Sequence, residues 1–233
     1  MARTEDEVAV DQEERPAGRL FNGISGQFGT ILIDPPWRFA NRTGKVGPEH
    51  KRLHRYQTMG FDEIAALTVE EFALPRSHLY LWCPNAILPE ALTIMKAWGF
   101  TYKTNIVWYK IRKDGGPDGR GVGFYFRNVT ELLLFGVKGH LRTRQPGRTQ
   151  VNLLMSRKRE HSRKPQAVYD LIERCSPGPY LELFARQRVE AWTQCGDELE
   201  TYTQVESLPS PCNRARGVLT AAVTVQSSPF KGR

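Results

Sequence analysis

Asp34, Pro35, Pro36 and Trp37 are the residues whose types and order most clearly indicate chemistry. They follow the apolar run 30–33, which predicts a buried strand that ends at Asp34. The Asp34 carboxylate and the Pro35 carbonyl are two hydrogen-bond acceptors, and successive prolines restrict the torsions that aim the carbonyl. The pair could grip both hydrogens of an exocyclic amino group. Trp37 then offers a flat face or a pocket wall for a base removed from its stack.

Methylation of the exocyclic amine of adenine is the chemistry that needs such a grip. The nitrogen lone pair is delocalised into the ring, so a catalyst must favour the pyramidal geometry in which the pair points at a methyl donor. A sulfonium donor already carries a charged leaving group, so no metal is needed. The alternative is that the prolines only end a strand and Trp37 packs in the core. That alternative gives no reason for the aspartate in front of them.

The elements that must position this motif read as an α/β fold, because short apolar runs alternate with helical patterns. In open α/β sheets ligands bind beyond the carboxyl ends of the strands, where Asp34 and the residues after Phe184 lie. Strands are expected over 30–33, 78–82, 104–109, 131–137, 180–184 and 191–193, with a Gly-rich loop over 113–123. A helix is expected over about 85–98, with Leu88, Leu92 and Met95 on one face and Gly99 as its stop. Another is expected from about Pro165, with its apolar face formed by Val168, Leu171, Ile172 and Cys175.

One domain is expected over residues 28–200, between a polar N-terminal tail, 1–27, and a Ser/Pro-rich C-terminal tail, 201–233. Within the tails, an ordered portion near 20–21 and a short strand over 217–225 are considered. Thirty-three Lys and Arg against 25 Asp and Glu leave a formal charge of +8, which favours a polyanionic partner such as nucleic acid. The basic stretches 42–55 and 138–164 are both expected beside the reaction edge, with solvated loops as the ordinary alternative.

Other classes of protein are disfavoured by the sequence. The four cysteines lie far apart, so neither a zinc site nor a disulfide framework is expected. No stretch approaches 18 apolar residues, and the N-terminus is acidic and polar, which predicts neither a membrane span nor a secretion signal. These features indicate a cytoplasmic protein.

Several segments, in order along about 28–198, resemble the family that contains the catalytic subunit of the eukaryotic messenger-RNA adenosine methyltransferase (MT-A type). They are 33–37, 56–59, 79–82, 135–139, 162–165, 172–174 and 181–186. The resemblance implies a Rossmann-like, S-adenosylmethionine-dependent methyltransferase fold in circularly permuted order, with the catalytic motif before the cofactor strand. The chain looks closest to the compact bacterial and phage members, which favours the cytoplasm of a prokaryotic or phage-infected cell.

The resemblance also implies roles for individual residues. Besides the catalytic Asp34, Pro35, Pro36 and Trp37, it places Asp34, Lys164, Glu182, Phe184, Arg186, Asp197 and Glu198 around S-adenosylmethionine. It places Tyr56, Trp82, Trp108, Arg127, Asn128 and Glu131 around the target base. Two departures from the messenger-RNA members are noted. Arg188-Val189 stands where they carry His-Asn, and the residues around Pro16 do not match the acidic group that those members place near the adenine of the cofactor.

Each of these residues also has an ordinary structural explanation. Tyr56 would be a surface tyrosine, and Trp82 and Trp108 would be core aromatics. Lys164 would be a solvated charge before a helix, where a cation is mildly unfavourable. Glu131 would form a buried ion pair with Arg127. An acid at Glu182, in the middle of a covered strand, calls for a partner such as a ribose hydroxyl.

Three functions remain open on the sequence. The favoured one is methylation of adenine in DNA, and the second is the same chemistry on RNA. The third is a catalytically silent, nucleic-acid-binding partner subunit, which the intact aspartate and tryptophan of the motif disfavour. The oligomeric state is open, with a homodimer or a heterodimer both considered.

Overall fold

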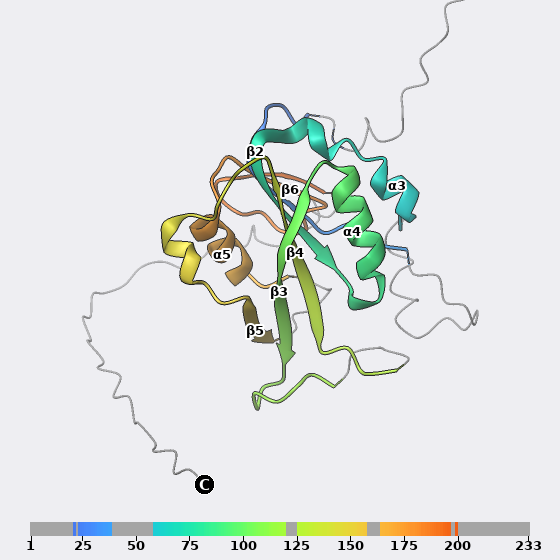
Figure 1. Cartoon of the computed structure of the whole chain (residues 1–233). Coiled ribbons are helices and arrows are strands. Elements are labelled where there is room, and N and C mark those ends of the chain that lie inside the picture. The colour runs from blue at the N-terminus through green and yellow to red at the C-terminus, as the bar shows by residue number, and fades with distance from the viewer. Residues whose placement is uncertain are drawn as a thin grey trace, which may run out of the picture.

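A computed structural model of the chain describes residues 21, 23–38, 58–119, 125–157, 164–196 and 199. These residues form a seven-stranded mixed sheet in the order β5-β3-β4-β2-β1-β6-β7 (Figure 1). The strands are β1 (Phe28–Ile33), β2 (Ala73–Cys83), β3 (Thr101–Ile111), β4 (Thr130–Lys138), β5 (Leu153–Arg157), β6 (Tyr180–Leu183) and β7 (Trp192–Cys195). The α/β fold class that the sequence predicts is confirmed, whereas the circularly permuted order stays a prediction.

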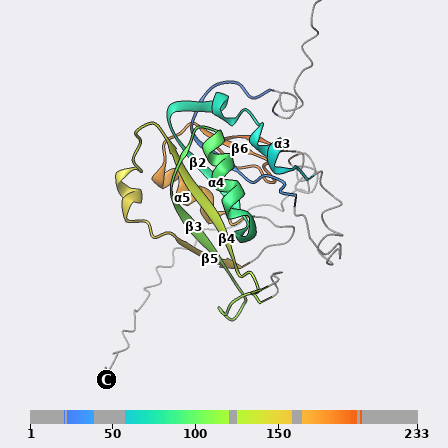
Figure 2. The same ribbon diagram turned by 45° about the vertical axis from the view of Figure 1, so that its right-hand side comes forward.

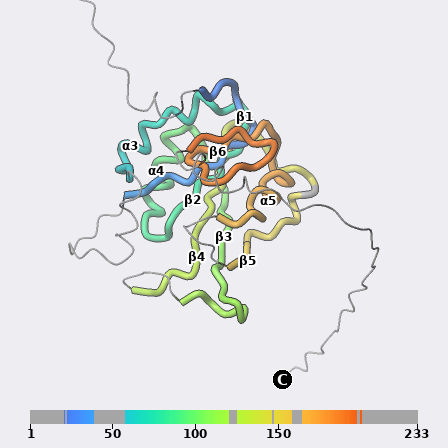
Figure 3. The backbone as a smooth tube through the Cα atoms, turned by 180° about the vertical axis from the view of Figure 1, so that it is seen from behind, coloured from blue at the N-terminus to red at the C-terminus, as the bar shows by residue number. Residues whose placement is uncertain are grey.

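Strand β1 lies inside the sheet between β2 and β6, and it is parallel to both (Figure 3). All six of its residues are buried, because helices cover both faces of the sheet. Ile31 and Ile33 pack in the cluster beneath α4 (Leu88–Ala97), whereas Leu32 packs in the cluster beneath α5 (Ala167–Cys175). Figure 2 shows the two helices on opposite sides of the strands.

The two main helices agree with the sequence pattern. Helix α5 buries the four residues that the pattern predicts, and it also buries Tyr169. Helix α4 follows a short 3-10 turn, η2 (Asn85–Ile87), and ends before Gly99, whose φ is +79°. The predicted face of α4 is confirmed, because Leu88, Leu92 and Met95 contact the same core cluster. Ala91 and Ile94 are buried in that cluster as well.

Four elements were not expected from the sequence: α3 (Phe61–Ala65), the 3-10 turns η1 (Val69–Phe72) and η3 (Gln145–Thr149), and β5. The helical pieces are too short to show a period. Strand β5 pairs only with β3 and leaves Leu153 and Met155 about half exposed, so its sequence does not alternate as a half-buried strand would.

The N-terminal side of the core begins before β1. Phe21 is buried, and its ring meets Phe72 at 6.0 Å and Phe184 at 5.7 Å between centroids, both edge-on. Packing therefore extends into the range 1–27 that the sequence assigns to a tail. The strand considered over 217–225 and the rest of the C-terminal tail lie outside the described residues.

The strands begin and end along two opposite sides of the sheet, and we call these two sides its edges. β4 runs antiparallel to β2, so Leu132 pairs with Cys83 at one edge and Lys138 pairs with Ser77 at the other. We call the first the reaction edge, because β1 ends there at Asp34. The prediction that the whole basic stretch 138–164 lies beside this edge is therefore wrong: its first residues lie at the opposite edge, and the chain returns through β5.

Candidate active site

Five charged side chains form a chain of ion pairs at the reaction edge. Lys110 Nζ lies 2.8 Å from Glu131 Oε2, Lys164 Nζ contacts Glu131 Oε1 and lies 3.2 Å from Asp34 Oδ1, and Arg186 Nη2 lies 3.8 Å from Asp34 Oδ2. The charges alternate in sign along this chain. The side chains of Asp34, Glu131 and Lys164 are each only 13% exposed, so the pairs are shielded from solvent.

Each member comes from a different part of the sheet. Asp34 follows β1, Arg186 follows β6, and Glu131 is the second residue of β4. Lys164 lies just before α5, and Lys110 is the penultimate residue of β3. The strands hold these positions in register, since Trp108 pairs with Glu131 and Leu183 pairs with Ile33. A rigid sheet thus fixes a charge cluster that no local segment could form.

The electrostatics of this cluster keep Glu131 and Lys164 ionised. Burial opposes the charge on Glu131, but Lys164 and Lys110 outweigh it and lower the pKa of that carboxyl to about 2. Burial likewise disfavours the Lys164 ammonium, but Asp34 and Glu131 raise its pKa overall. Lys164 is therefore a fixed cation between two carboxylates, not the solvated charge of the ordinary explanation.

The backbone of residues 34–37 is held by its own turn and by residues 58–60. Trp37 N–H donates to the Pro35 carbonyl at 2.8 Å, and Met59 N–H donates to the Pro36 carbonyl at 2.8 Å. The Pro35 carbonyl keeps a second lone pair for another donor. The Trp37 indole is 5% exposed and donates to the Trp82 carbonyl at 3.1 Å. Trp37 thus packs in the core and anchors the motif, as the structural alternative predicts.

Trp82 and Trp108 lie side by side at the reaction edge, with ring centroids 5.8 Å apart at 70°. Lysine ammonium groups cover them: Lys164 Nζ lies 4.6 Å from the Trp82 ring, and Lys110 Nζ lies 4.6 Å from the Trp108 ring. Both indoles are almost fully buried. Their role as walls of a base pocket stays a prediction, and what the structure shows is that they support the two lysines.

Glu182 is buried in the middle of β6, and protein groups satisfy its carboxylate. Tyr169 O–H lies 2.9 and 3.1 Å from its two oxygens, and Gln194 Nε2 donates to Oε2 at 2.5 Å. Burial raises the pKa of this carboxyl to about 7, although the two donors favour the charged form. The acid that the sequence pairs with a ribose hydroxyl therefore already has partners within the fold.

The chain after β6 turns sharply beside Asp34. Phe184 has a φ of 61°, a left-handed conformation that is uncommon for a side chain of this size. Ala185 N–H donates to the Cys195 carbonyl at 2.9 Å, and a Cβ at Gly196 would lie 2.1 Å from the Ala185 carbonyl oxygen. Only glycine fits at 196, so β7 clamps the turn that brings Arg186 to Asp34.

The remaining predicted residues divide into two groups. Arg127 and Asn128 are exposed at the reaction edge, where Asn85 Nδ2 lies 3.5 Å from Asn128 Oδ1 and 3.0 Å from Thr130 Oγ1. Tyr56, Asp197 and Glu198 lie outside the described residues.

Among residues that the structure describes, no group of three or more His, Cys, Asp or Glu side chains could hold a metal ion, and no helix could cross a membrane.

Sequence reasoning missed three residues of the site. Lys110 lies two residues after Trp108 in β3, a spacing that places both side chains on one face, and that spacing was the available signal. Tyr169 and Gln194 gave no local signal, because only the pairing of β6 with β7 and the packing of α5 bring them to Glu182.

Comparisons with known proteins agree with this geometry. The Mycoplasma type II methyltransferase M.MunI is 27% identical over 189 residues, 74% of this chain and 78% of its own. An Arabidopsis thaliana N(6)-adenosine-methyltransferase MT-A70-like protein is 29% identical over 180 residues, 76% of this chain and 24% of its own. The human N(6)-adenosine-methyltransferase catalytic subunit METTL3 is 28% identical over 181 residues, 76% of this chain and 29% of its own.

The chain therefore spans under a third of the Arabidopsis and human relatives, but most of the length of M.MunI. The matched regions contain the motif after β1, the start of β4, Lys164 and the turn after β6. The MT-A70 family model matches residues 28–198, nearly the whole described structure, and the chain belongs to the MT-A70 family.

Proposed function

We propose that this protein is an adenine-specific methyltransferase that transfers a methyl group from S-adenosylmethionine to the exocyclic 6-amino group of adenine in nucleic acid, with DNA as the favoured substrate. The observation that carries the proposal is Asp34. It lies at the end of β1 within the Asp-Pro-Pro-Trp motif, and Lys164 and Arg186 flank its carboxylate. The chain belongs to a family whose relatives are named adenosine methyltransferases.

The charges around Asp34 fit the amino-acid end of the methyl donor. One carboxylate beside two cations is complementary to a zwitterion, since the carboxylate attracts an ammonium and the cations attract a carboxylate. We assign Asp34 to the ammonium and Lys164 to the carboxylate, with Arg186 and the Phe184 turn beside the rest of the cofactor. When bound, S-adenosylmethionine supplies an electrophilic methyl group on a sulfonium.

The residues of this chain then orient the target amine. The Asp34 carboxylate and the free lone pair of the Pro35 carbonyl each accept one amino hydrogen, which turns the nitrogen lone pair toward the methyl donor. The Trp37 backbone N–H, which donates to the Pro35 carbonyl, and the Met59 N–H, which donates to the neighbouring Pro36 carbonyl, hold this turn in place. We place Tyr56, Arg127, Asn128 and Glu131 around the target base, and Asp197 and Glu198 beside the cofactor ribose.

The choice of DNA rests on the resemblance to the compact bacterial and phage members of the family, for which DNA is the favoured substrate. The chain matches M.MunI along most of that enzyme, while it matches only a fraction of the plant and human relatives. The same chemistry on RNA is the second candidate, because those longer relatives are named adenosine methyltransferases. A silent partner subunit is disfavoured because the acid of the motif is intact and already ion-paired at the edge. A prokaryotic or phage-infected cytoplasm is the compartment that we propose.

The test is methyl transfer from tritiated S-adenosylmethionine to matched DNA and RNA oligonucleotides, followed by nucleoside analysis. Label is expected in N6-methyladenine, with more in DNA. Asp34→Ala is expected to lower the rate by at least about a hundredfold, because an acceptor of the reacting amine is lost. Asp170→Ala is the matched control, since Asp170 is exposed on α5. Label in cytosine, in protein or nowhere would overturn the proposal, as would full activity of Asp34→Ala.

A further inference from the structure

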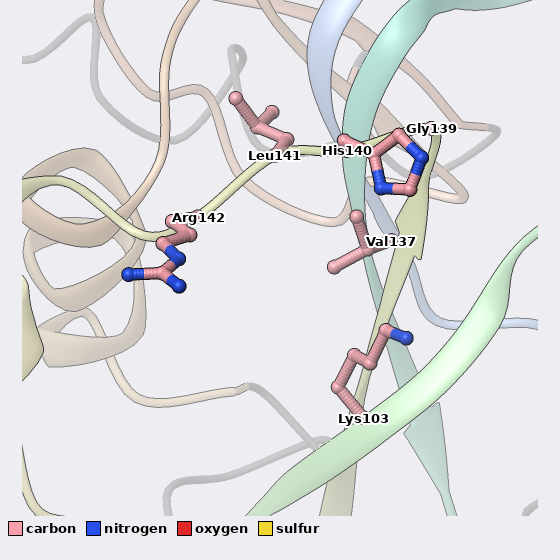
Figure 4. A pocket seen from close by; sticks show the side chains of 6 residues that line it. All are labelled: Lys103, Val137, Gly139, His140, Leu141 and Arg142. Atoms are coloured by element: carbon pink, nitrogen blue, oxygen red, sulfur yellow. The ribbon is translucent and has the colours of Figure 1, made fainter.

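A shallow hollow of about 300 Å³ lies at the edge of the sheet opposite the reaction edge (Figure 4). It is lined by Lys103, Val137, Gly139, His140, Leu141 and Arg142. Val137 pairs with Thr101 at the start of β3 and with His78 in β2, which fixes the hollow at this opposite edge. The residues that we place in methyl transfer are therefore not part of it.

Three basic side chains from two segments line this hollow, with Lys103 and His140 on one side and Arg142 on the other (Figure 4). Lys103 comes from β3, and His140 and Arg142 come from the chain after β4, while Val137 and Leu141 supply apolar surface between them (Figure 4). No acidic side chain lines it. By contrast, the adjacent Lys138 points to Glu70, 2.9 Å away.

The positive charges of Lys103 and Arg142 are not neutralised by an ion pair within the described part of the chain. No ion pair or side-chain hydrogen bond joins Lys103, His140 or Arg142 to any described residue. Like charges in one concave site repel each other and raise the local positive potential, which an anion relieves. A phosphate group, with several acceptor oxygens and a negative charge, matches such a set of donors.

We propose that this hollow binds a backbone phosphate of the nucleic acid whose adenine occupies the reaction edge. Glu131 and Val137 are six residues apart in β4 and therefore face the same side of the sheet. At about 3.3 Å per residue the hollow lies about 20 Å from the reaction edge, roughly six base pairs of duplex at about 3.4 Å each. The inference rests on the proposed nucleic-acid substrate and lengthens the stretch of nucleic acid that the protein contacts.

The test measures binding of a fluorescent DNA duplex against salt concentration, by polarisation, for full-length wild type, Lys103→Gln and Arg142→Gln. Each variant is expected to reduce the slope of log K against log salt by about one, because each removes one phosphate contact. Lys96→Gln is the matched control: Lys96 is equally exposed but lies on α4, on the other face of the sheet, and the slope should not change. All three substituted side chains are exposed, so folding is preserved.

Duplex length gives a second, independent readout. With about twelve base pairs on each side of the adenine, the variants should bind more weakly than wild type. With about three base pairs on each side, their affinity should equal that of wild type, because three base pairs reach only about 10 Å from the adenine and the hollow lies about 20 Å away. Equal slopes for wild type and both variants would overturn the site while leaving the methylation proposal intact.

Three further outcomes would also overturn the inference. If Lys96→Gln lowers the slope as much as Lys103→Gln, the effect is net charge and not a site. Calorimetry tests whether inorganic phosphate binds wild type but not the Lys103→Gln, Arg142→Gln double variant. If it does, and wild type and the variants have the same salt slope for duplex binding, the hollow binds a free anion and not the nucleic acid. Failure of wild type to bind any duplex would likewise overturn the inference about the hollow. The methyl-transfer assay on DNA and RNA oligonucleotides tests the nucleic-acid substrate separately, which distinguishes the two proposals.

Discussion

Glu182 shows how a single residue can have both a structural and an electrostatic consequence. Its carboxylate is 6% exposed and depends on Tyr169 and Gln194 for hydrogen bonds. Burial raises its pKa from 4.5 to about 7, so between these two values the folded protein binds more protons than the unfolded chain. Folding stability should therefore fall as pH rises from about 4.5 to about 7 and stay constant above, by about 3 kcal/mol in all.

Tyr169→Phe tests this at the residue scale. The hydroxyl that is lost donates to the carboxylate, and the ionised form needs that donor more than the protonated form does. The free energy of unfolding of the variant should be lower than that of wild type by about 1–3 kcal/mol at about pH 8 and by clearly less at about pH 5, as measured by urea unfolding. Tyr180→Phe is the control, since its hydroxyl donates to backbone carbonyls and its cost should not depend on pH. Equal losses of Tyr169→Phe at both pH values would contradict the assignment.

Among the elements, β4 runs from the reaction edge to the basic hollow at the opposite edge of the sheet. It begins with Thr130 and Glu131 at the reaction edge and ends beside the basic hollow, and it lies between β2 and β3 in the interior of the sheet. Gly136 allows α4 to approach this strand: a Cβ there would lie 2.8 Å from Met95 Sδ and 3.2 Å from Phe100 Cβ. The closeness of the helix to the strand therefore depends on one missing side chain.

Gly136→Ala should therefore destabilise the protein by about 1–3 kcal/mol, because the added methyl group overpacks the contact between helix and sheet. The measurement is the free energy of unfolding in urea. Gly119→Ala is the matched control, since nothing lies within 4 Å of a Cβ at that position. A cost no greater than that of the control would mean that α4 shifts freely, against the tight packing described above.

At the scale of the whole molecule, Phe21 extends the core beyond the expected boundary at residue 28. Its ring joins the η1 turn, through Phe72, to the turn after β6, through Phe184. A residue from the predicted tail thus supports the segment that we place beside the cofactor. The boundary of the folded unit on this side is set by packing and not by composition.

Phe21→Ala should lower the free energy of unfolding by about 3–5 kcal/mol, as for other buried phenylalanines. It should also weaken S-adenosylmethionine binding, because Phe184 loses a packing partner. Chemical unfolding and titration calorimetry measure the two effects. Phe126→Ala is the control for stability, because that side chain is 86% exposed. An unfolding free energy of Phe21→Ala equal to that of wild type would place the boundary back at residue 28.

The sequence by itself determined the local features: the strand that ends at Asp34, the buried face of α5, the α/β alternation and the family motifs. These depend on residue type and period over a few positions, which the chain displays directly. Only the tertiary structure decided that Lys110, Glu131, Lys164, Asp34 and Arg186 form one chain of charges, that Trp37 is buried, and that residues 138–142 lie away from the reaction edge. Those facts follow from strand order, direction and register, which join residues far apart in the chain and leave no periodic signal within any one segment.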